Sequence, residues 1–303
     1  MSERMAVLLD TDPGSDIDDV VALAYLLVER RCELVGVTTV SGPTEQRAGI
    51  VDVVLRAAGR TDVPVYAGLH GPVCGGPGQP QVPQYAAVKD LPHRKDFRRG
   101  EAIDFLRETI RRRPGELTLL TIGPLTNIAA LRLIDPEAAG MLRQVVTMGG
   151  RYFPPAGWLA DGQWSEWNIR CDPIAAKMVY DARLPGHVSY GLDVTERCAL
   201  PAAEVRRRFE GHPLLRSLLP MAEVWFQKSE KLTFHDPLAA AAVFDPGLCT
   251  YETGTVCLEP SAWEHAGART YFIRELAGGG PHRVARTVSA EAFFERYFGV
   301  FGD

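Results

Sequence analysis

The order of the hydrophobic segments constrains the fold of this chain more than any other feature. Short apolar or β-branched runs alternate with segments of helical periodicity through most of the sequence. We expect strands at 6–9, 34–40, 63–66, 117–122, 144–148, 186–192, 255–258, 270–274 and 283–288, and helices at 20–28, 44–59, 101–112, 126–134 and 172–182. Strands that alternate with helices predict an α/β fold in which a mostly parallel sheet has helices on both faces.

Three segments interrupt this alternation. Residues 68–99 are rich in glycine, proline and glutamine, residues 151–165 are rich in glycine, proline and tryptophan, and residues 214–234 look helical. Long loops in compact domains are often functional, so we expect segments 71–99 and 214–234 to form lids beside a pocket. No linker divides the chain, and residues 1–303 are therefore expected to form a single domain.

The composition excludes several classes of partner. The formal net charge of -5 argues against a nucleic-acid surface, which requires a basic face. No apolar run approaches the ~18 residues that span a bilayer, and the first residues lack the apolar core of a signal peptide. The six cysteines are scattered and form no Cys-x-x-Cys pair, which is typical of reduced thiols. We therefore expect a cytoplasmic protein that binds neither nucleic acid nor membrane.

An acidic loop directly follows the first expected strand. It carries five carboxylates within ten residues, namely Asp10, Asp12, Asp16, Asp18 and Asp19. Like charges at this density repel one another, and protonation or a bound cation must relieve the repulsion. Oxygen ligands suit a hard divalent cation, either Ca²⁺ or Mg²⁺. A favourable interaction of Asp18 and Asp19 with a helix dipole would leave the other three carboxylates unexplained.

Three other motifs with acidic or phosphate-binding loops fit less well. An EF-hand that starts at Asp10 requires glycine at its sixth place and glutamate at its twelfth, where this chain has Ser15 and Val21. A Walker A loop requires Gly-Lys-Ser/Thr, which the chain lacks. An aspartyl-phosphate phosphatase also has an Asp-x-Asp loop after its first strand. That chemistry needs a later lysine and a second acidic loop, for which the sequence offers no convincing pair.

The acidic loop resembles the signature of the inosine–uridine nucleoside hydrolase family, Asp-x-Asp-Pro-Gly-x-Asp-Asp followed by a helix. Further segments resemble the family in the same order, namely 123–127 (GPLTN), 148–150 (MGG), 166–173 (EWNIRCDP), 191–195 (GLDVT) and 235–237 (HDP). Together they cover nearly the whole chain. The resemblance implies an enzyme that hydrolyses the N-glycosidic bond of ribonucleosides to ribose and free base. It also implies a homodimer or homotetramer.

The resemblance further implies a calcium site with defined ligands. Asp12, Asp19 and Asp236 would bind Ca²⁺ through their carboxylates, and Ile122 would bind it through its backbone carbonyl. Asp12 would also take a proton from the water that the calcium ion holds. Asp10 would orient the loop rather than take part in the chemistry.

A second group of residues is assigned to the substrate by the same resemblance. Asp18, Glu166 and Asn168 would bind the ribose hydroxyls, and Met148 would pack beneath the sugar. His235 would contact the base or protonate the leaving nitrogen, because an imidazole can donate a proton near neutral pH.

Several of these residues also have a simpler structural explanation. Glu166 and Asn168 could form the turns of a surface loop, and Met148 could be an ordinary core residue at a strand end. Asn127 could cap the helix that follows it, and a lone histidine such as His235 is often structural.

The chain also departs from the family pattern. Its acidic loop is two residues longer, so Asp16 could take the place assigned to Asp18. Pro43 and Ala160 stand where the family usually has asparagine near the substrate. These losses concern sugar and base contacts rather than metal ligands. A modified nucleoside, another ribosyl compound, or a calcium-dependent ribosyl-binding protein without turnover therefore remain alternatives.

Overall fold

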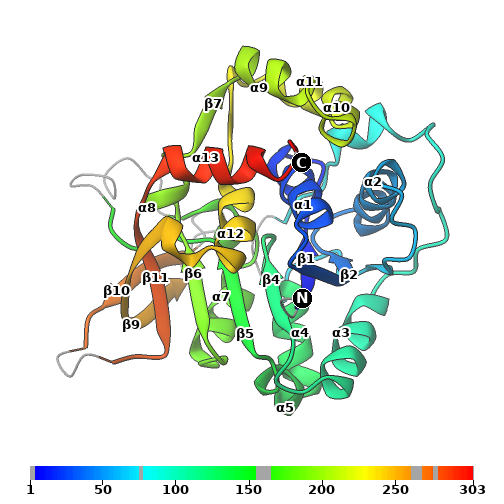
Figure 1. Ribbon diagram of the computed structural model, residues 1–303. Helices are drawn as coiled ribbons and strands as arrows, with labels where there is room; N and C mark the ends of the chain where they lie inside the picture. Colours follow the sequence, from blue (N-terminus) through cyan, green and yellow to red (C-terminus); the bar gives the residue numbers. More distant parts are fainter. Residues whose placement is uncertain (1–3, 75–77, 155–164, 261–267, 276–278, 303) are drawn as a thin grey trace.

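The computed structural model describes residues 4–74, 78–154, 165–260, 268–275 and 279–302, and a nine-stranded sheet forms its centre (Figure 1). The strand order is β10 (Ala268–Ile273), β9 (Cys249–Pro260), β11 (His282–Val288), β6 (His187–Tyr190), β5 (Gln144–Met148), β4 (Thr118–Thr121), β1 (Met5–Thr11), β2 (Cys32–Thr39) and β3 (Val65–Ala67). Neighbouring strands from β11 to β3 pair in parallel. Among the strands that the structure describes, only the β9–β11 and β10–β9 pairs of this sheet are antiparallel. The predicted mostly parallel sheet is confirmed.

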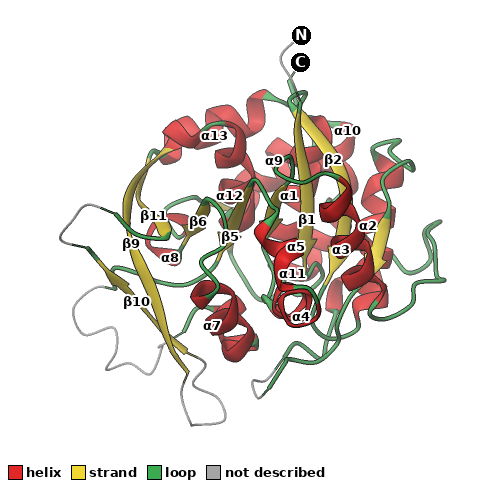
Figure 2. Cartoon of the chain, turned by 90° about the horizontal axis from the view of Figure 1, so that it is seen from below, coloured by secondary structure: helices red, strands yellow, loops and turns green. Residues whose placement is uncertain are grey.

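Helices cover both faces of this sheet, because successive side chains of a strand point to opposite faces. Val7 and Leu9 pack into one hydrophobic core, whereas Ala6 and Leu8 pack into the other. The first core includes residues of α1 (Asp18–Val28), α2 (Thr44–Ala57), α12 (His235–Phe244) and α13 (Ala290–Gly299). The second includes residues of α3 (Glu101–Arg112), α4 (Thr126–Ile134), α5 (Pro136–Gly140) and α7 (Pro173–Asp181). Figure 2 shows α7 and α13 on opposite sides of the strands.

Smaller elements complete the chain beyond the sheet. They are η1 (Pro83–Ala87), α6 (Trp167–Cys171), α8 (Leu192–Thr195), β7 (Ala199–Pro201), α9 (Ala202–Phe209), α10 (Pro213–Ser217), α11 (Leu219–Phe226), β8 (Lys231–Thr233) and η3 (Pro246–Leu248). The expectation that residues 214–234 are helical agrees with α10 and α11 and is wrong for residues 231–233. Residues 231–233 pair antiparallel with β7, and the N–H of Phe234 donates to the carbonyl of Cys198 at 2.7 Å. A distant strand therefore determines the structure of this short segment.

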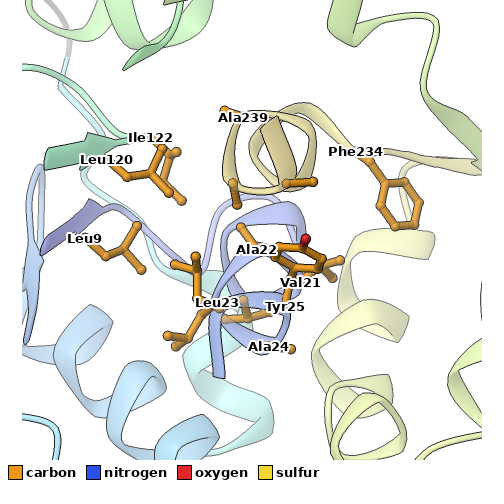
Figure 3. Packing of buried hydrophobic residues seen from close by; sticks show 14 of the residues in the cluster. Leu9, Val21, Ala22, Leu23, Ala24, Tyr25, Leu120, Ile122, Phe234 and Ala239 are labelled. Atoms are coloured by element: carbon orange, nitrogen blue, oxygen red, sulfur yellow. The ribbon is translucent and has the colours of Figure 1, made fainter. Parts of the chain in front are cut away.

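The first helix of the chain is buried between the sheet and α12. Figure 3 shows Leu9, Leu120 and Ile122 on one side of α1 and Ala239 of α12 on another. Helix α12 carries four consecutive alanines, and small side chains allow two helices to approach closely. The two helices begin near each other, because the N–H of Asp236 donates to Oδ2 of Asp18 at 3.3 Å. This packing brings the first and last motifs of the sequence together.

All six cysteines are free thiols. Within the described ranges, no helix combines the length and the apolar character that crossing a bilayer requires.

Candidate metal and substrate site

The carboxyl ends of the central strands and the first turns of two helices form one buried site. Asp12 directly follows β1, Ile122 directly follows β4, and Met148 is the last residue of β5. Asp18 and Asp19 begin α1, and Asp236 lies in the first turn of α12. Because β1, β4 and β5 run parallel and adjacent, their carboxyl ends meet at the same edge of the sheet.

Three carboxylates form the centre of the site. Asp18, Asp19 and Asp236 each offer an oxygen, and these atoms lie within 4.8 Å of one another. Burial and then the neighbouring carboxylates raise the pKa of all three well above the usual range of aspartate. A divalent cation would relieve this repulsion without protonating the carboxylates. An all-oxygen donor set of this kind fits Ca²⁺ or Mg²⁺.

Asp12 lies beside this cluster. Its backbone N–H donates to Oδ1 of Asp19 at 3.0 Å. A Cβ at Gly123 would lie 2.6 Å from Oδ1 of Asp12, so the missing side chain at Gly123 makes room for this oxygen. The opposite oxygen, Oδ2, accepts a hydrogen bond from the side-chain amide of Gln79. Burial raises the pKa of Asp12, and the charge of Arg47 partly opposes that effect.

Asn168 connects two strand ends of the site. Its Nδ2 donates to the carbonyl oxygen of Ile122 at 2.8 Å and to that of Met148 at 3.2 Å, and it lies 3.7 Å from the Met148 sulfur. A carbonyl oxygen has two lone pairs, so the Ile122 carbonyl can accept this bond and still bind a cation. Met148 is 3% exposed and belongs to the core, in agreement with its simpler explanation.

Glu166 is buried beside this asparagine and holds backbone amides. Its carboxylate accepts hydrogen bonds from the N–H groups of Asn168 at 2.8 Å, Ile169 at 3.1 Å and Gly150 at 3.1 Å. It therefore caps α6, which is the kind of local role that its simpler explanation assigns to it. The location differs from that explanation, because Glu166 is 4% exposed and not part of a surface loop. Burial raises its pKa to about 7.

His235 is half-buried at the first position of α12. Its Nδ1 lies 2.7 Å from the hydroxyl oxygen of Thr195, which belongs to the 191–195 motif. Burial, followed by the positive charges of Lys231 and Arg151, lowers the pKa of His235 to about 4. The imidazole is therefore neutral at pH 7, and Nε2 is the ring nitrogen that does not face Thr195.

The structure corrects the expectation for Asn127 and distinguishes Asp16 from Asp18. Asn127 does not cap α4, because its Nδ2 donates to Oδ1 of Asp10 at 2.7 Å and no side chain in the described part of the chain caps this helix. Asp10 thus binds the first turn of α4 through this hydrogen bond. Among the described residues, the carboxylate cluster contains Asp18 and not Asp16, whose Oδ1 accepts from the N–H of Ile17. Ala160 lies outside the described residues.

Sequence reasoning missed two polar residues that contact the acidic loop. Arg47 of α2 is fully buried, and its guanidinium donates to the carbonyl oxygens of Ser41 at 2.6 Å, of Pro13 at 2.9 Å and of Asp12. Gln79 comes from segment 71–99 and is 4% exposed. An arginine within a helix and a glutamine within a glycine- and proline-rich segment carry no local signal of a buried site.

The sequence matches a known protein family over most of its length. The family described as inosine-uridine preferring nucleoside hydrolase matches residues 7–295. The chain is 29% identical to uridine nucleosidase 1 of Arabidopsis thaliana, over 97% of this chain and 92% of the relative. It is 28% identical to the pyrimidine-specific ribonucleoside hydrolase of Salmonella paratyphi B, over 92% of each.

A solved structure supports the fold independently. A plant nucleoside hydrolase superposes with a TM-score of 0.79, at 24% identity and 98% coverage of both chains. A likeness at this level of identity concerns the fold alone, whereas the family match covers nearly all of the sequence. The chain belongs to the inosine-uridine preferring nucleoside hydrolase family and is an N-glycosidase that acts on ribonucleosides.

Proposed function

We propose that this hydrolase uses Ca²⁺ held by Asp12, Asp19, Asp236 and the carbonyl of Ile122, with Asp12 as the general base. The observation that carries the proposal is the buried juxtaposition of carboxylates from the two ends of the chain beside Asp12. A bound Ca²⁺ would favour the ionised form of these carboxylates, lower the pKa of a nearby water molecule and provide sites for ribose hydroxyls.

Asp12 then takes a proton from the attacking water at its carboxylate. The water oxygen forms a bond to C1′ of the ribose while the bond from C1′ to the base nitrogen breaks. The electron pair of that bond leaves with the base. A proton must then reach the base nitrogen so that the base departs as a neutral molecule. His235 is the proposed donor, and Thr195 orients the imidazole through its hydroxyl. Because the imidazole is neutral before the reaction, it takes up a proton from solvent as negative charge develops on the base and passes that proton to the base nitrogen.

The substrate contacts are proposed beside the metal ligands, because Asp18 lies in the carboxylate cluster and Asn168 contacts the carbonyl of Ile122. Asp18, Glu166 and Asn168 bind ribose hydroxyls, since carboxylate and amide oxygens accept hydrogen bonds from a polyol. Buried polar contacts of this kind discriminate strongly against deoxyribose, because a missing hydroxyl leaves them without a partner. Met148 supports the sugar through its apolar side chain.

The base is the least constrained part of the proposed substrate. The names of the relatives favour a pyrimidine ribonucleoside, and uridine is the first substrate to test. The departures at Pro43 and Ala160 make a modified nucleoside the second candidate. We also propose that segments 71–99 and 214–234 act as lids, that the protein is cytoplasmic, and that it forms a homodimer or homotetramer. Light scattering of the purified protein tests the last point.

Free ribose, measured with a panel of ribonucleosides in Ca²⁺ and in a chelator, tests the function. Calcium-dependent release is expected, and Asp12→Asn is expected to lower kcat by about 10²- to 10⁴-fold. Asp16→Asn is the matched control in the same loop and is expected to retain activity. Calcium binding without release from any ribonucleoside would favour the binding-protein alternative. Near wild-type turnover of Asp12→Asn would contradict the assignment of the base.

A further inference from the structure

Gln79 places a side-chain amide directly on the carboxylate of Asp12. Its Nε2 donates to Oδ2 of Asp12, and the Gln79 side chain is almost completely buried. The orientation of the amide follows from chemistry, since an ionised carboxylate only accepts hydrogen bonds and the amide nitrogen is the donor. Segment 71–99 therefore contributes a polar group to the centre of the site.

The carbonyl oxygen of Gln79 lies close to Arg47 and to Gly42. Arg47 Nη2 donates to the carbonyl oxygen of Gln79 at 3.4 Å. A Cβ at Gly42 would overlap that same oxygen, so glycine is required there, and the φ of +66° at Gly42 also favours glycine. Since Arg47 also binds the carbonyls of Asp12 and Pro13, one guanidinium joins the acidic loop to the segment that carries Gln79.

The two oxygens of Asp12 consequently have different surroundings. Oδ1 faces Gly123 beside the end of β4, whereas Oδ2 faces the amide of Gln79. Rotation about the terminal bond of an aspartate is soft, so the carboxylate plane needs an external contact to fix it. The hydrogen bond from Gln79 supplies that contact and still leaves a lone pair on Oδ2.

The amide oxygen of Gln79 indicates that packing alone does not explain a glutamine at this position. Gln79 Oε1 is buried and has no hydrogen-bond partner among the described residues. Burial of a polar atom without a partner is unfavourable, and a leucine of similar size would avoid it. The bond to Asp12 is what an amide provides here and an apolar side chain does not.

We propose that Gln79 is a positioning residue that fixes the carboxylate of Asp12, and that Arg47 holds Gln79 in place. The inference rests on the proposed function, in which Asp12 is the general base. Gln79 acts through Asp12, so its loss should change turnover more than substrate or calcium binding. A misplacement of a catalytic group by about 1 Å can cost 10²-fold in rate.

The test compares three variants of the full-length protein loaded with Ca²⁺. Gln79→Leu is expected to lower kcat by about 10- to 100-fold, with KM and the calcium affinity from titration calorimetry changed less than about threefold. Gln79→Glu places a second carboxylate against Asp12 and is expected to lower kcat at least as much. Gln84→Leu is the matched control, since Gln84 is a fully buried glutamine of the same segment whose amide has no partner among the described residues.

Arg47 supplies a graded version of the same test. Arg47→Lys keeps a positive charge and one donor for the carbonyls, and it is expected to retain more of kcat than Arg47→Met. Equal losses in the two variants would overturn the part of the inference that concerns Arg47.

A second measurement separates failure of this inference from failure of the proposed function. The melting temperatures of Gln79→Leu, Asp12→Ala and the double variant are compared with that of the wild type without Ca²⁺. Non-additive shifts are expected, because each single variant removes the same contact. Additive shifts would overturn the role of Gln79. A kcat of Gln79→Leu within twofold of the wild type, with Asp12→Asn inactive, would overturn it as well. Neither result would contradict the proposed function. Absence of ribose release from the wild type would instead contradict the proposed function. The melting temperatures would still show whether the contact between Gln79 and Asp12 contributes to stability.

Discussion

The N–H of Asp236 donates to Oδ2 of Asp18 at 3.3 Å, which joins the first turns of α12 and α1 across 218 positions of sequence. This bond places two carboxylates within the same buried cluster, where burial and mutual repulsion favour their neutral forms. A divalent cation changes that balance, because it pairs with the ionised forms.

We therefore expect calcium to stabilise the folded protein through this cluster. At a free Ca²⁺ concentration of a hundred times Kd, linkage gives about 2.7 kcal/mol of added stability. Asp236→Asn is expected to lose most of this increase, and to be no less stable than the wild type in a chelator. Thermal unfolding with and without Ca²⁺ measures both effects. The exposed substitution Asp62→Asn is the control, and a full calcium response in Asp236→Asn would contradict the assignment of this ligand.

The hydrogen bonds of Asn127 predict a large effect on stability. Its Nδ2 donates to Asp10 at 2.7 Å and to the carbonyl of Thr39 at 3.1 Å, while its Oδ1 accepts from the N–H of Leu69 at 2.9 Å. Asn127→Ala removes these three hydrogen bonds, each worth about 0.5–1.5 kcal/mol. The N–H of Leu69 loses its partner, whereas Asp10 Oδ1 keeps the Thr38 hydroxyl and the Thr39 carbonyl keeps the N–H of Gly68. We expect the free energy of unfolding in urea to fall by at least about 2 kcal/mol.

Gln46→Ala provides the comparison for this measurement. Gln46 is exposed on α2, and substitutions at such positions usually stay within about 0.5 kcal/mol. A loss in Asn127→Ala as small as that of Gln46→Ala would mean that the Asn127 contacts contribute little.

The proposed proton donor can be tested by the choice of leaving group. His235→Ala is expected to lower kcat for a ribonucleoside by about 10²- to 10⁴-fold, because the base then departs without a proton. A riboside with a nitrophenolate leaving group needs no proton, so the same variant should hydrolyse it at nearly the wild-type rate. Steady-state kinetics on both substrates makes the comparison. Equal losses on the two substrates would show that His235 serves the site in another way.

His187 predicts a loss of stability in acid that is independent of the active site. Burial, followed by the charge of His282, lowers the pKa of His187 to about 3, and its Nε2 lies 2.9 Å from the Thr147 hydroxyl oxygen. Below a pH of about 6.5 the unfolded chain binds a proton at this histidine that the folded chain excludes. The free energy of unfolding therefore falls as the pH decreases from about 6.5 toward 3, by up to about 1.4 kcal/mol per pH unit.

His187→Gln removes this contribution. Urea unfolding at pH 7, 6 and 5 is expected to show a shallower pH dependence for the variant than for the wild type. His70→Gln, at an exposed position, is the control. Parallel curves for the wild type and His187→Gln would contradict the prediction.

The parts of the fold that follow from periodicity agree with expectation. Helices at 101–112 and 126–134 and the strand at 144–148 have the predicted bounds, because each has a clear apolar pattern of its own. The strand at 231–233 was not predicted, since it is short and has no alternation of its own. It exists because β7 offers backbone groups that pair with it.

The sequence alone determined the α/β class and the family, because hydrophobic periodicity and contiguous motifs are local properties of a chain. It also identified the acidic loop and the His-Asp pair, whose residue types indicate their chemistry. Only the tertiary structure decided that Arg47 and Gln79 contact Asp12, that Asn127 binds Asp10, and that Glu166 holds three backbone amides. The physical reason is that a buried polar group needs a partner, and folding can supply it from any segment of the chain.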